Sequence, residues 1–303
     1  MKHLELYWVD AFSEKPFYGN PATVVIDADD LPDEKKQEIA REMNLSETVF
    51  ISKSKVADFR VQFFTPKQET ALCGHGTVAA FMVLVSIGRI KRNPGEDIVS
   101  VRQETEAGVL PIEISFDSNG LPGNIMMFQT LPEFRDCYVN SSEIAEILGI
   151  PINQFDSSYP LKVVSIGRPK LFIPIVNRDV LYAIKPDFDR MANYCAKESI
   201  TGFHLFTFDT HLSDSNTAAR HFAPSAGVNE DPVTGIAAGA LGCYLSEFGN
   251  HQDPVLSFQM EQGFNMERNG IIQIEIRKEN QLYKSVKVGG KAYLLFNAGM
   301  KLK

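Results

Sequence analysis

The sequence has no excess of positive charge. Its 30 Lys and Arg residues are outnumbered by 38 Asp and Glu residues, so the formal net charge is −8. A protein that binds a nucleic-acid backbone or an anionic membrane usually presents a basic surface. We therefore expect neither nucleic acid nor a membrane as a partner.

Long hydrophobic runs and clustered cysteines are also missing. No apolar run approaches the roughly 20 residues that span a bilayer. The first residues, MKHLELYWVDAF, alternate like a strand and lack the apolar core of a signal peptide. The four cysteines, Cys73, Cys137, Cys195 and Cys243, are scattered without a CxxC pair, which is typical of reduced thiols. These absences predict a cytoplasmic protein.

The two halves of the chain contain similar segments in the same order. GNPATVV resembles the later GRPKLFI, because each is a Gly-x-Pro turn that leads into an apolar strand. A helical segment followed by a strand comes next in both halves, as DEKKQEIAREMN–LSETVFIS and FDRMANYCAKES–ITGFHLFTF. Then FFTPKQETALCGHGTVAA is matched by HFAPSAGVNEDPVTGIAAGAL. Collinear matches of this kind indicate a tandem duplication.

The pattern of elements predicts an α+β fold with two similar lobes. Strands cluster instead of alternating with helices, which argues against a doubly wound sheet. GTVAAFMVLVSIG and GIAAGALGCYLSEFG have almost no polar face, so each is expected to be a helix buried on every side inside a curled, barrel-like mixed sheet. We expect lobes related by a pseudo-twofold axis, one over 1–122 completed by about 290–303 and one over 123–289.

The starts of these two helices are rich in glycine. A helix start has unsatisfied N–H groups and a partial positive charge, so it is suited to binding a carboxylate or a phosphate. Our hypothesis is that the two starts face each other across the cleft between the lobes. Local capping is the alternative, with Thr70 as N-cap of the first helix and Asp231 followed by Pro232 opening the second. Both can hold at once.

The CGHG segment places Cys73 and His75 at the first helix start. A zinc site needs three or four ligands, and this segment supplies two, so metal binding is disfavoured. The helix start would activate a Cys73 thiol, although a buried cysteine is more often a small hydrophobic residue. The repeat places Thr234 opposite Cys73, so a racemase that uses two thiols would lack its second acid/base.

Several motifs together resemble the PhzF-like isomerase family of phenazine biosynthesis. They are FSEKPFYGNP, NLSETVF, FFTPKQETALCGHGTVAA, RHFAPSAGVNEDPVTGIAAGAL, the later QG…ER and VGGKAYLL, and they cover nearly the whole chain. The resemblance implies a diaminopimelate-epimerase-like fold, an active site in the cleft between the lobes, and a homodimer. It also implies isomerisation by acid/base chemistry without a cofactor. The founding member of the family moves a proton within a cyclic dihydro-hydroxyanthranilate, with a glutamate as the base.

The resemblance also implies which residues act. The base maps onto Glu47 of NLSETVF, and His75 and Asp231 would orient the substrate or relay a proton. From the residues alone, Glu47 follows an expected helix C-cap at Asn44 and precedes a strand, where a solvated glutamate is the ordinary alternative. For His75 the ordinary alternative is a hydrogen-bonded core histidine. The expected substrate-binding residues, which would hold a small-molecule carboxylate without any metal, are Asn20, Cys73, Gly74, Gly76, Gly235, Ile236 and Ala237.

One residue departs from the family pattern. After EDPVTG the family commonly has a serine that meets the substrate, whereas this chain has Ile236, which offers no hydrogen bond. We therefore expect a related cyclic or amino-acid-like substrate with an apolar group at that point. Two other readings remain open: an amino-acid racemase or epimerase, and a protein that binds a small ligand without catalysis.

Overall fold

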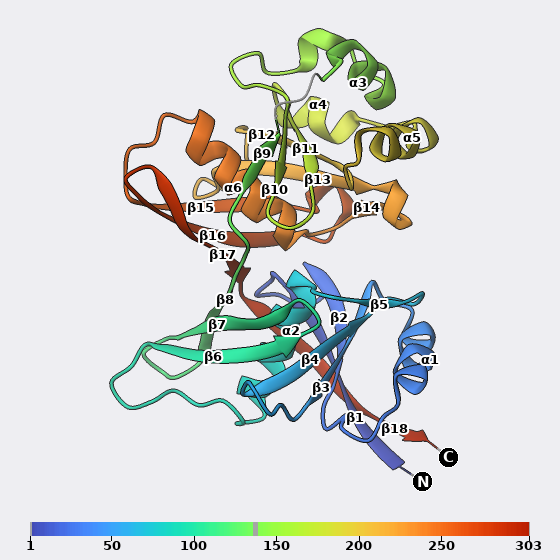
Figure 1. The fold of residues 1–303 in the computed structure, drawn as a ribbon, viewed down its shortest axis with the longest axis vertical. Coiled ribbons are helices and arrows are strands. Elements are labelled where there is room, and N and C mark those ends of the chain that lie inside the picture. Colours follow the sequence, from blue (N-terminus) through green and yellow to red (C-terminus); the bar gives the residue numbers. More distant parts are fainter. Residues whose placement is uncertain (1, 136–138, 303) are drawn as a thin grey trace. The chain divides into compact units, whose positions relative to one another are not determined.

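The structure is a computed structural model that describes residues 2–135 and 139–302, so Cys137 lies outside the described residues. The chain divides into two compact units (Figure 1). Unit 1 comprises Met1–Phe128 and Gly289–Lys303, and unit 2 comprises Gln129–Val288. Both are mixed α+β units dominated by strands, which confirms the predicted fold class.

Unit 1 is a curled mixed sheet. Its strands pair in the order β18 (Ala292–Leu302), β1 (Lys2–Ala11), β2 (Asn20–Val25), β3 (Glu47–Ser52), β4 (Phe59–Phe64), β6 (Ile98–Thr105), β7 (Gly108–Phe116) and β8 (Pro122–Phe128). The pairs β2–β3 and β4–β6 are parallel, and the other pairs in this series are antiparallel. The short strand β5 (Glu69–Thr70) pairs with β4. Two helices, α1 (Asp33–Met43) and α2 (Gly74–Ser86), complete the unit.

Unit 2 repeats the same pairing pattern. Its strands are β9 (Glu133–Arg135), β10 (Lys162–Ser165), β11 (Lys170–Pro174), β12 (Phe203–Thr207), β13 (Thr217–Ala223), β14 (Val228–Asp231), β15 (Val255–Gln262), β16 (Gly270–Glu279) and β17 (Leu282–Gly290). The β11–β12 and β13–β15 pairs are parallel, as β2–β3 and β4–β6 are in unit 1. Its α-helices are α3 (Ser141–Leu148), α4 (Arg178–Ala183), α5 (Phe188–Glu198) and α6 (Gly235–Phe248).

Strand register fixes which residues of the two units are equivalent. Thr48 pairs with Phe64 in unit 1, and Phe203 pairs with Phe222 in unit 2. Because Phe64 and Phe222 both belong to the Phe-x-Pro motif of the sequence repeat, Thr48 corresponds to Phe203. The residue equivalent to Glu47 is therefore Gly202, as the sequence repeat predicted.

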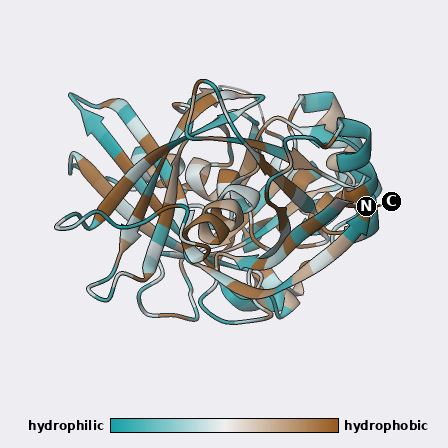
Figure 2. Ribbon diagram, turned by 90° about the horizontal axis from the view of Figure 1, so that it is seen from below, coloured by the Kyte–Doolittle hydropathy of each residue, from teal (hydrophilic) through white to brown (hydrophobic). Residues whose placement is uncertain are grey.

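Helices α2 and α6 are buried on nearly all sides, as their lack of a polar face predicted. Figure 2 shows apolar colour on enclosed helix and strand segments and hydrophilic colour on loops and outer helices. Small residues let strands approach α6 closely, since a Cβ added to Gly242 would lie 2.6 Å from Ile274 Cγ2. Within the described residues, no helix is both long and apolar enough to cross a membrane.

The sheet faces turned away from these two helices carry separate hydrophobic clusters. In unit 1 the cluster includes Ile39 of α1 together with Phe50 and Phe64 of the sheet. In unit 2 it joins helices α3, α4 and α5 to residues such as Leu171 and Phe203. Helix α1 ends at Asn44, which has φ 51° and is its C-cap, as predicted. That ending leads the chain directly into β3 and its first residue, Glu47.

Candidate active site

Glu47 is the first residue of β3 and is buried, with 7% of its surface exposed. The β2–β3 register pairs it with Ala22, and Ala22 shares a face with Val24 and Val49. Val49 packs against the first turn of α2, since a Cβ added to Gly76 would lie 3.0 Å from Val49 Cγ2. The Glu47 carboxylate therefore lies on the face turned toward α2. The Thr70 hydroxyl donates to Glu47 Oε1 over 3.4 Å.

Cys73 is the N-cap of α2. Its backbone is extended, with φ −138° and ψ 126°, and its Sγ accepts a hydrogen bond from the Gly76 N–H over 3.4 Å. The expected cap at Thr70 is therefore wrong, because Thr70 belongs to β5 and pairs with Phe63 of β4. The Cys73 sulfur satisfies one N–H group of the helix start and faces into the site.

His75 links Cys73 to the loop before β3. Its Nδ1 lies 3.3 Å from Cys73 Sγ, and its Nε2 lies 3.2 Å from Ser46 Oγ. Ser46 Oγ in turn lies within hydrogen-bond distance, 3.4 Å, of Asn20 Oδ1. Burial lowers the pKa of His75 to about 4, so its imidazole is neutral at neutral pH. A neutral imidazole can accept a proton at one nitrogen and donate at the other.

The expected residues of unit 1 therefore lie together. Asn20, Glu47, Cys73 and His75 surround the first turn of α2, where Gly74 and Gly76 are buried. Two further participants were missed by the sequence reasoning. Ser46 precedes Glu47 within NLSETVF but was not singled out, and Thr70 was interpreted only as a cap.

The expected residues of unit 2 surround the first turn of α6. Asp231 ends β14, and its Oδ2 accepts a hydrogen bond of 2.5 Å from Thr234 Oγ1. The N-cap of α6 is Thr234. The prediction that Asp231 is the N-cap, with Pro232 as the first helical residue, is therefore wrong by three residues. Gly235 and Ala237 are buried and Ile236 is partly exposed. Asp231 thus supports the cap residue through its hydroxyl and does not cap the helix itself.

Gln262 was missed by the sequence reasoning, although it lies in the QG…ER motif. It is buried at the end of β15, where its Nε2 donates to the Asp231 carbonyl oxygen over 2.8 Å. Its Oε1 accepts the Thr234 N–H over 3.2 Å. The amide therefore satisfies a donor at the helix start and fixes the position of Asp231. Three more buried polar residues lie on neighbouring strands, Lys170, His204 and His221.

Two of the three described cysteines, Cys195 and Cys243, lie outside these groups. Within the described part of the chain, Cys73, Cys195 and Cys243 are buried and form no disulfide. Burial raises the pKa of the Cys195 and Cys243 thiols to about 12, so both stay protonated. In the same part of the chain, no three His, Cys, Asp or Glu residues are arranged to hold a metal ion.

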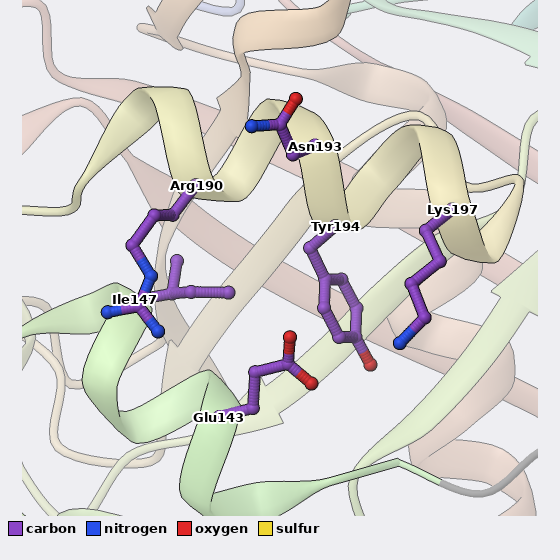
Figure 3. A pocket seen from close by; sticks show the side chains of 6 residues that line it. All are labelled: Glu143, Ile147, Arg190, Asn193, Tyr194 and Lys197. Carbon is purple, nitrogen blue, oxygen red and sulfur yellow. The ribbon is translucent and has the colours of Figure 1, made fainter.

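A pocket of about 210 Å³ lies between α3 and α5 of unit 2 (Figure 3). It contains none of the expected site residues, and its Arg190 is paired with Glu146. The Arg190 guanidinium is therefore already compensated by a carboxylate. Its lining residues are Glu143, Ile147, Arg190, Asn193, Tyr194 and Lys197.

Comparisons with known proteins identify the family of the chain. Residues 9–298 match the family described as phenazine biosynthesis-like protein. An uncharacterized isomerase of Clostridium acetobutylicum is 32% identical, over 100% of this chain and 99% of its own. A trans-2,3-dihydro-3-hydroxyanthranilate isomerase of Pseudomonas fluorescens is 31% identical, over 80% of this chain and 79% of its own.

Solved structures extend the comparison. A Bacillus anthracis protein of the PhzF family has a TM-score of 0.91 at 32% identity, with 100% of both chains covered. A hydroxyproline epimerase of Agrobacterium vitis has a TM-score of 0.65 at 10% identity, covering 98% of this chain and 92% of its own, so it is similar in fold alone. That likeness is consistent with the diaminopimelate-epimerase-like fold. The chain belongs to the phenazine biosynthesis-like (PhzF) family of isomerases.

Proposed function

We propose that this protein isomerises a small cyclic or amino-acid-like carboxylate by moving one proton, with Glu47 as the base and without a cofactor. The observation that carries the proposal is the position of Glu47, a buried carboxylate beside the glycine-rich start of a buried helix. A base for carbon acids must be positioned within reach of the proton and partly shielded from water. Burial shields Glu47 from water, and we propose that its carboxylate reaches the substrate proton; its equivalent in the other half is Gly202, which has no side chain.

Of the two equivalent positions, Glu47 and Gly202, only one carries a carboxylate, which favours a shift over an inversion. A racemase that works from two faces needs two acid/base groups, whereas one base can remove a proton and return it on the same face. In unit 2 the position of Cys73 is taken by the N-cap Thr234, whose hydroxyl is a poor acid/base group. The duplicated fold therefore offers different chemistry in its two halves.

The helix start of α2 is the proposed binding site for the substrate carboxylate. The N–H groups from Gly74 to Gly76 open a helix with no acidic residue in its first turn, and a helix N-terminus favours negative charge. His75 would orient the substrate or pass a proton, since its neutral imidazole contacts both Ser46 and Cys73. Gly235 to Ala237 remain the second predicted carboxylate-binding segment, and the interlobe cleft stays a prediction.

Ile236 limits which substrate fits. The side chain is partly exposed in the first turn of α6 and supplies apolar volume where the family commonly has a hydroxyl. We propose that the substrate carries an apolar group at that point. It would then differ from the trans-2,3-dihydro-3-hydroxyanthranilate for which the Pseudomonas fluorescens relative is named.

One observation supports a second candidate. Cys73 Sγ lies 3.3 Å from His75 Nδ1, and a thiol beside an imidazole at a helix start can itself act as a base. Under this alternative the protein is a racemase or epimerase in which Cys73 removes the proton. A third reading, ligand binding without catalysis, predicts that the wild type binds a ligand but turns over none.

The test compares Glu47→Gln with a matched control, Glu69→Gln. Glu69 lies on β5 opposite Phe64, on the other face of the strand pair, where it accepts a hydrogen bond from Gln62. Loss of a general base lowers the rate by roughly 10²- to 10⁴-fold, so Glu47→Gln should lose that much activity while Glu69→Gln keeps most of it. Equal activity of the two variants would remove Glu47 from the mechanism.

The cytoplasmic location stays a prediction from the composition, and the homodimer stays a prediction from the family resemblance. Sedimentation equilibrium of the purified chain tests the oligomeric state. A mass near 68 kDa, roughly twice the 33.8 kDa chain, is expected. A mass equal to one chain would contradict it.

A further inference from the structure

A largely buried ion pair joins strands β13 and β14 of unit 2. Arg220 of β13 donates from Nε and Nη2 to the two carboxylate oxygens of Glu230 of β14, over 2.8 and 2.9 Å. The two side chains are 7% and 16% exposed. Arg220 Nη1 also donates to the carbonyl oxygens of Leu181 and Ile184 at the end of α4, over 2.9 Å each. Because a guanidinium forms two parallel bonds with a carboxylate, the pair fixes both the position and the orientation of Glu230.

Ring contacts identify the inner face of this sheet, which is turned toward the buried helix α6. Phe172 of β11 stacks on Tyr244 of α6 with ring centroids 5.9 Å apart. The strand register pairs Phe172 with His204 of β12, and His204 with His221 of β13. Paired residues share a face, so His221 also lies on the inner face.

Asp231 lies on the inner face as well, and the ion pair lies on the outer face. The register of β13 and β14 pairs Asp231 with His221. Arg220 and Glu230 each precede one of these two residues in the chain, and successive residues of a strand point to opposite faces. The bonds from Arg220 to the end of α4 agree, because α4 packs on the outer face. The ion pair therefore holds, from the outer face, the residue directly before Asp231.

The end of β15 and the residues after it hold the same segment. Asn265 donates from Nδ2 to Glu230 Oε1 over 3.0 Å, and Gln262 donates to the Asp231 carbonyl oxygen over 2.8 Å. Between them, Gly263 approaches the chain closely, since a Cβ added there would lie 2.7 Å from the Pro232 carbonyl oxygen. Its φ of 83° also favours glycine. The backbone before and after Asp231 is therefore fixed by several separate contacts.

Unit 1 shows that the fold does not require an ion pair at this place. By strand register and by the sequence repeat, Arg220 and Glu230 are equivalent to Gln62 and Glu69. One hydrogen bond of 3.0 Å joins Gln62 to Glu69, and its donor is an uncharged amide. The residue after Glu69 is the uncharged Thr70, whereas a carboxylate follows Glu230. The stronger connection thus accompanies the charged residue of the site.

We propose that Arg220 and Glu230 are positioning residues for the isomerisation: their ion pair holds the peptide that carries Asp231, and so keeps the Asp231 carboxylate beside the first turn of α6. The bond of 2.5 Å between Thr234 Oγ1 and Asp231 Oδ2 depends on this placement. A displacement of about 1 Å at a reacting group can lower a rate by roughly 10²-fold. The inference rests on the proposed function and on the role that the family resemblance implies for Asp231.

The first test needs no substrate and uses Arg220→Gln, which gives unit 2 the residue that unit 1 has at this position. A glutamine amide can still donate to Glu230, but it cannot form the two parallel bonds. Crystal structures of the wild type and of the variant are compared. In Arg220→Gln the Asp231 carboxylate is expected to leave Thr234 or to occupy more than one conformation. An Asp231 carboxylate that keeps its single position and its bond to Thr234 would overturn the proposal.

The second test measures kcat per folded molecule with trans-2,3-dihydro-3-hydroxyanthranilate as the probe. Arg220→Gln should lower kcat roughly ten- to hundredfold, and Arg220→Lys, which keeps the charge, should lower it less. The control is Met191→Ala, which removes a buried side chain from the outer hydrophobic cluster of unit 2. It should lower the urea midpoint and leave kcat unchanged. If Arg220→Gln also lowers only the urea midpoint, the ion pair serves stability alone and the proposal is wrong.

The third test asks whether the ion pair acts through Asp231. Once Asp231→Asn has removed the carboxylate, its exact placement no longer matters. The double variant Arg220→Gln/Asp231→Asn should therefore have the same kcat as Asp231→Asn alone, because residues that act as a unit are not additive. Two effects that multiply in the double variant would show independent action and contradict the proposal.

Failure of the positioning role and failure of the proposed function give different results. A wild type that is inactive toward the probe, together with a displaced Asp231 in Arg220→Gln, contradicts the proposed function for that probe and supports the positioning role. An Arg220→Gln variant with the wild-type kcat overturns the positioning role, even if Glu47→Gln is inactive.

Discussion

Replacing His204 with valine should make the protein less sensitive to acid. His204 is fully buried, its pKa is lowered to about 3, and its equivalent in unit 1 is Val49. The folded protein therefore keeps this imidazole neutral at pH 5, whereas in the unfolded chain the same group takes up a proton below about 6.5. Because the unfolded state binds more protons in this window, stability falls as the pH falls.

The size of the effect follows from the same linkage. Between pH 7 and pH 5, one histidine that is protonated only in the unfolded state lowers the free energy of unfolding by about 2 kcal/mol. Between pH 7 and pH 5 the free energy of unfolding should therefore fall by about 2 kcal/mol more in the wild type than in His204→Val. His221 should add a loss of the same sign in both proteins, since burial lowers its pKa too.

Urea denaturation followed by circular dichroism at pH 7 and pH 5 measures this difference. The exposed His251 supplies a matched control, and His251→Gln should follow the wild-type pH dependence. If His204→Val loses as much stability as the wild type between the two pH values, then the buried imidazole does not stay neutral in the folded state. That result would refute the reasoning applied to the buried imidazoles of His204 and His221.

Three further substitutions test other parts of the account. Arg220→Met should lower the free energy of unfolding by about 3 kcal/mol in urea denaturation, because it leaves the Glu230 carboxylate of a largely buried, bidentate ion pair without its partner; unchanged stability would contradict this. Cys73→Ala should lower the free energy of unfolding by about 1 kcal/mol, because it removes the acceptor for the Gly76 N–H, whereas Cys73→Ser should retain most of the wild-type stability; equal thermal stability of the two variants would argue against the cap. Ile236→Ser should bind trans-2,3-dihydro-3-hydroxyanthranilate more tightly than the wild type in calorimetry, and equal affinities would count against the proposed role of Ile236.

Much of the fold was predictable because it follows from local patterns. The two helices without a polar face had to be buried, and the collinear repeats indicated two similar lobes before any strand was located. Asn44 was predicted as a C-cap because the left-handed conformation that ends a helix suits asparagine. These inferences depend on residues close together in the chain, which a single sequence displays directly.

The helix starts were less predictable, because several residues near each start can act as a cap. Thr70 and Asp231 are suitable cap residues by type, but pairing of β5 and β14 with their neighbours draws both into the sheets. Cys73 and Thr234 then occupy the cap positions. Only the strand register, which depends on distant residues, decides between these candidates.

The surroundings of the site were also beyond the sequence reasoning. Ser46 contacts His75 from a loop 29 residues away in the chain, and such contacts follow from the tertiary fold. Lys170, His204 and His221 left a signal that could have been found, because they occupy positions in apolar strands whose repeat equivalents are apolar. Aligning the two halves residue by residue would have singled them out.

Proton NMR in D₂O tests the central claim most directly. Wild type, Glu47→Gln and Cys73→Ala are each incubated with trans-2,3-dihydro-3-hydroxyanthranilate and a panel of related cyclic and amino-acid carboxylates. The account predicts isomerisation or deuterium exchange with at least one of them, abolished in Glu47→Gln and retained in Cys73→Ala. Exchange that persists in Glu47→Gln and disappears in Cys73→Ala would contradict it and assign the proton transfer to the thiol.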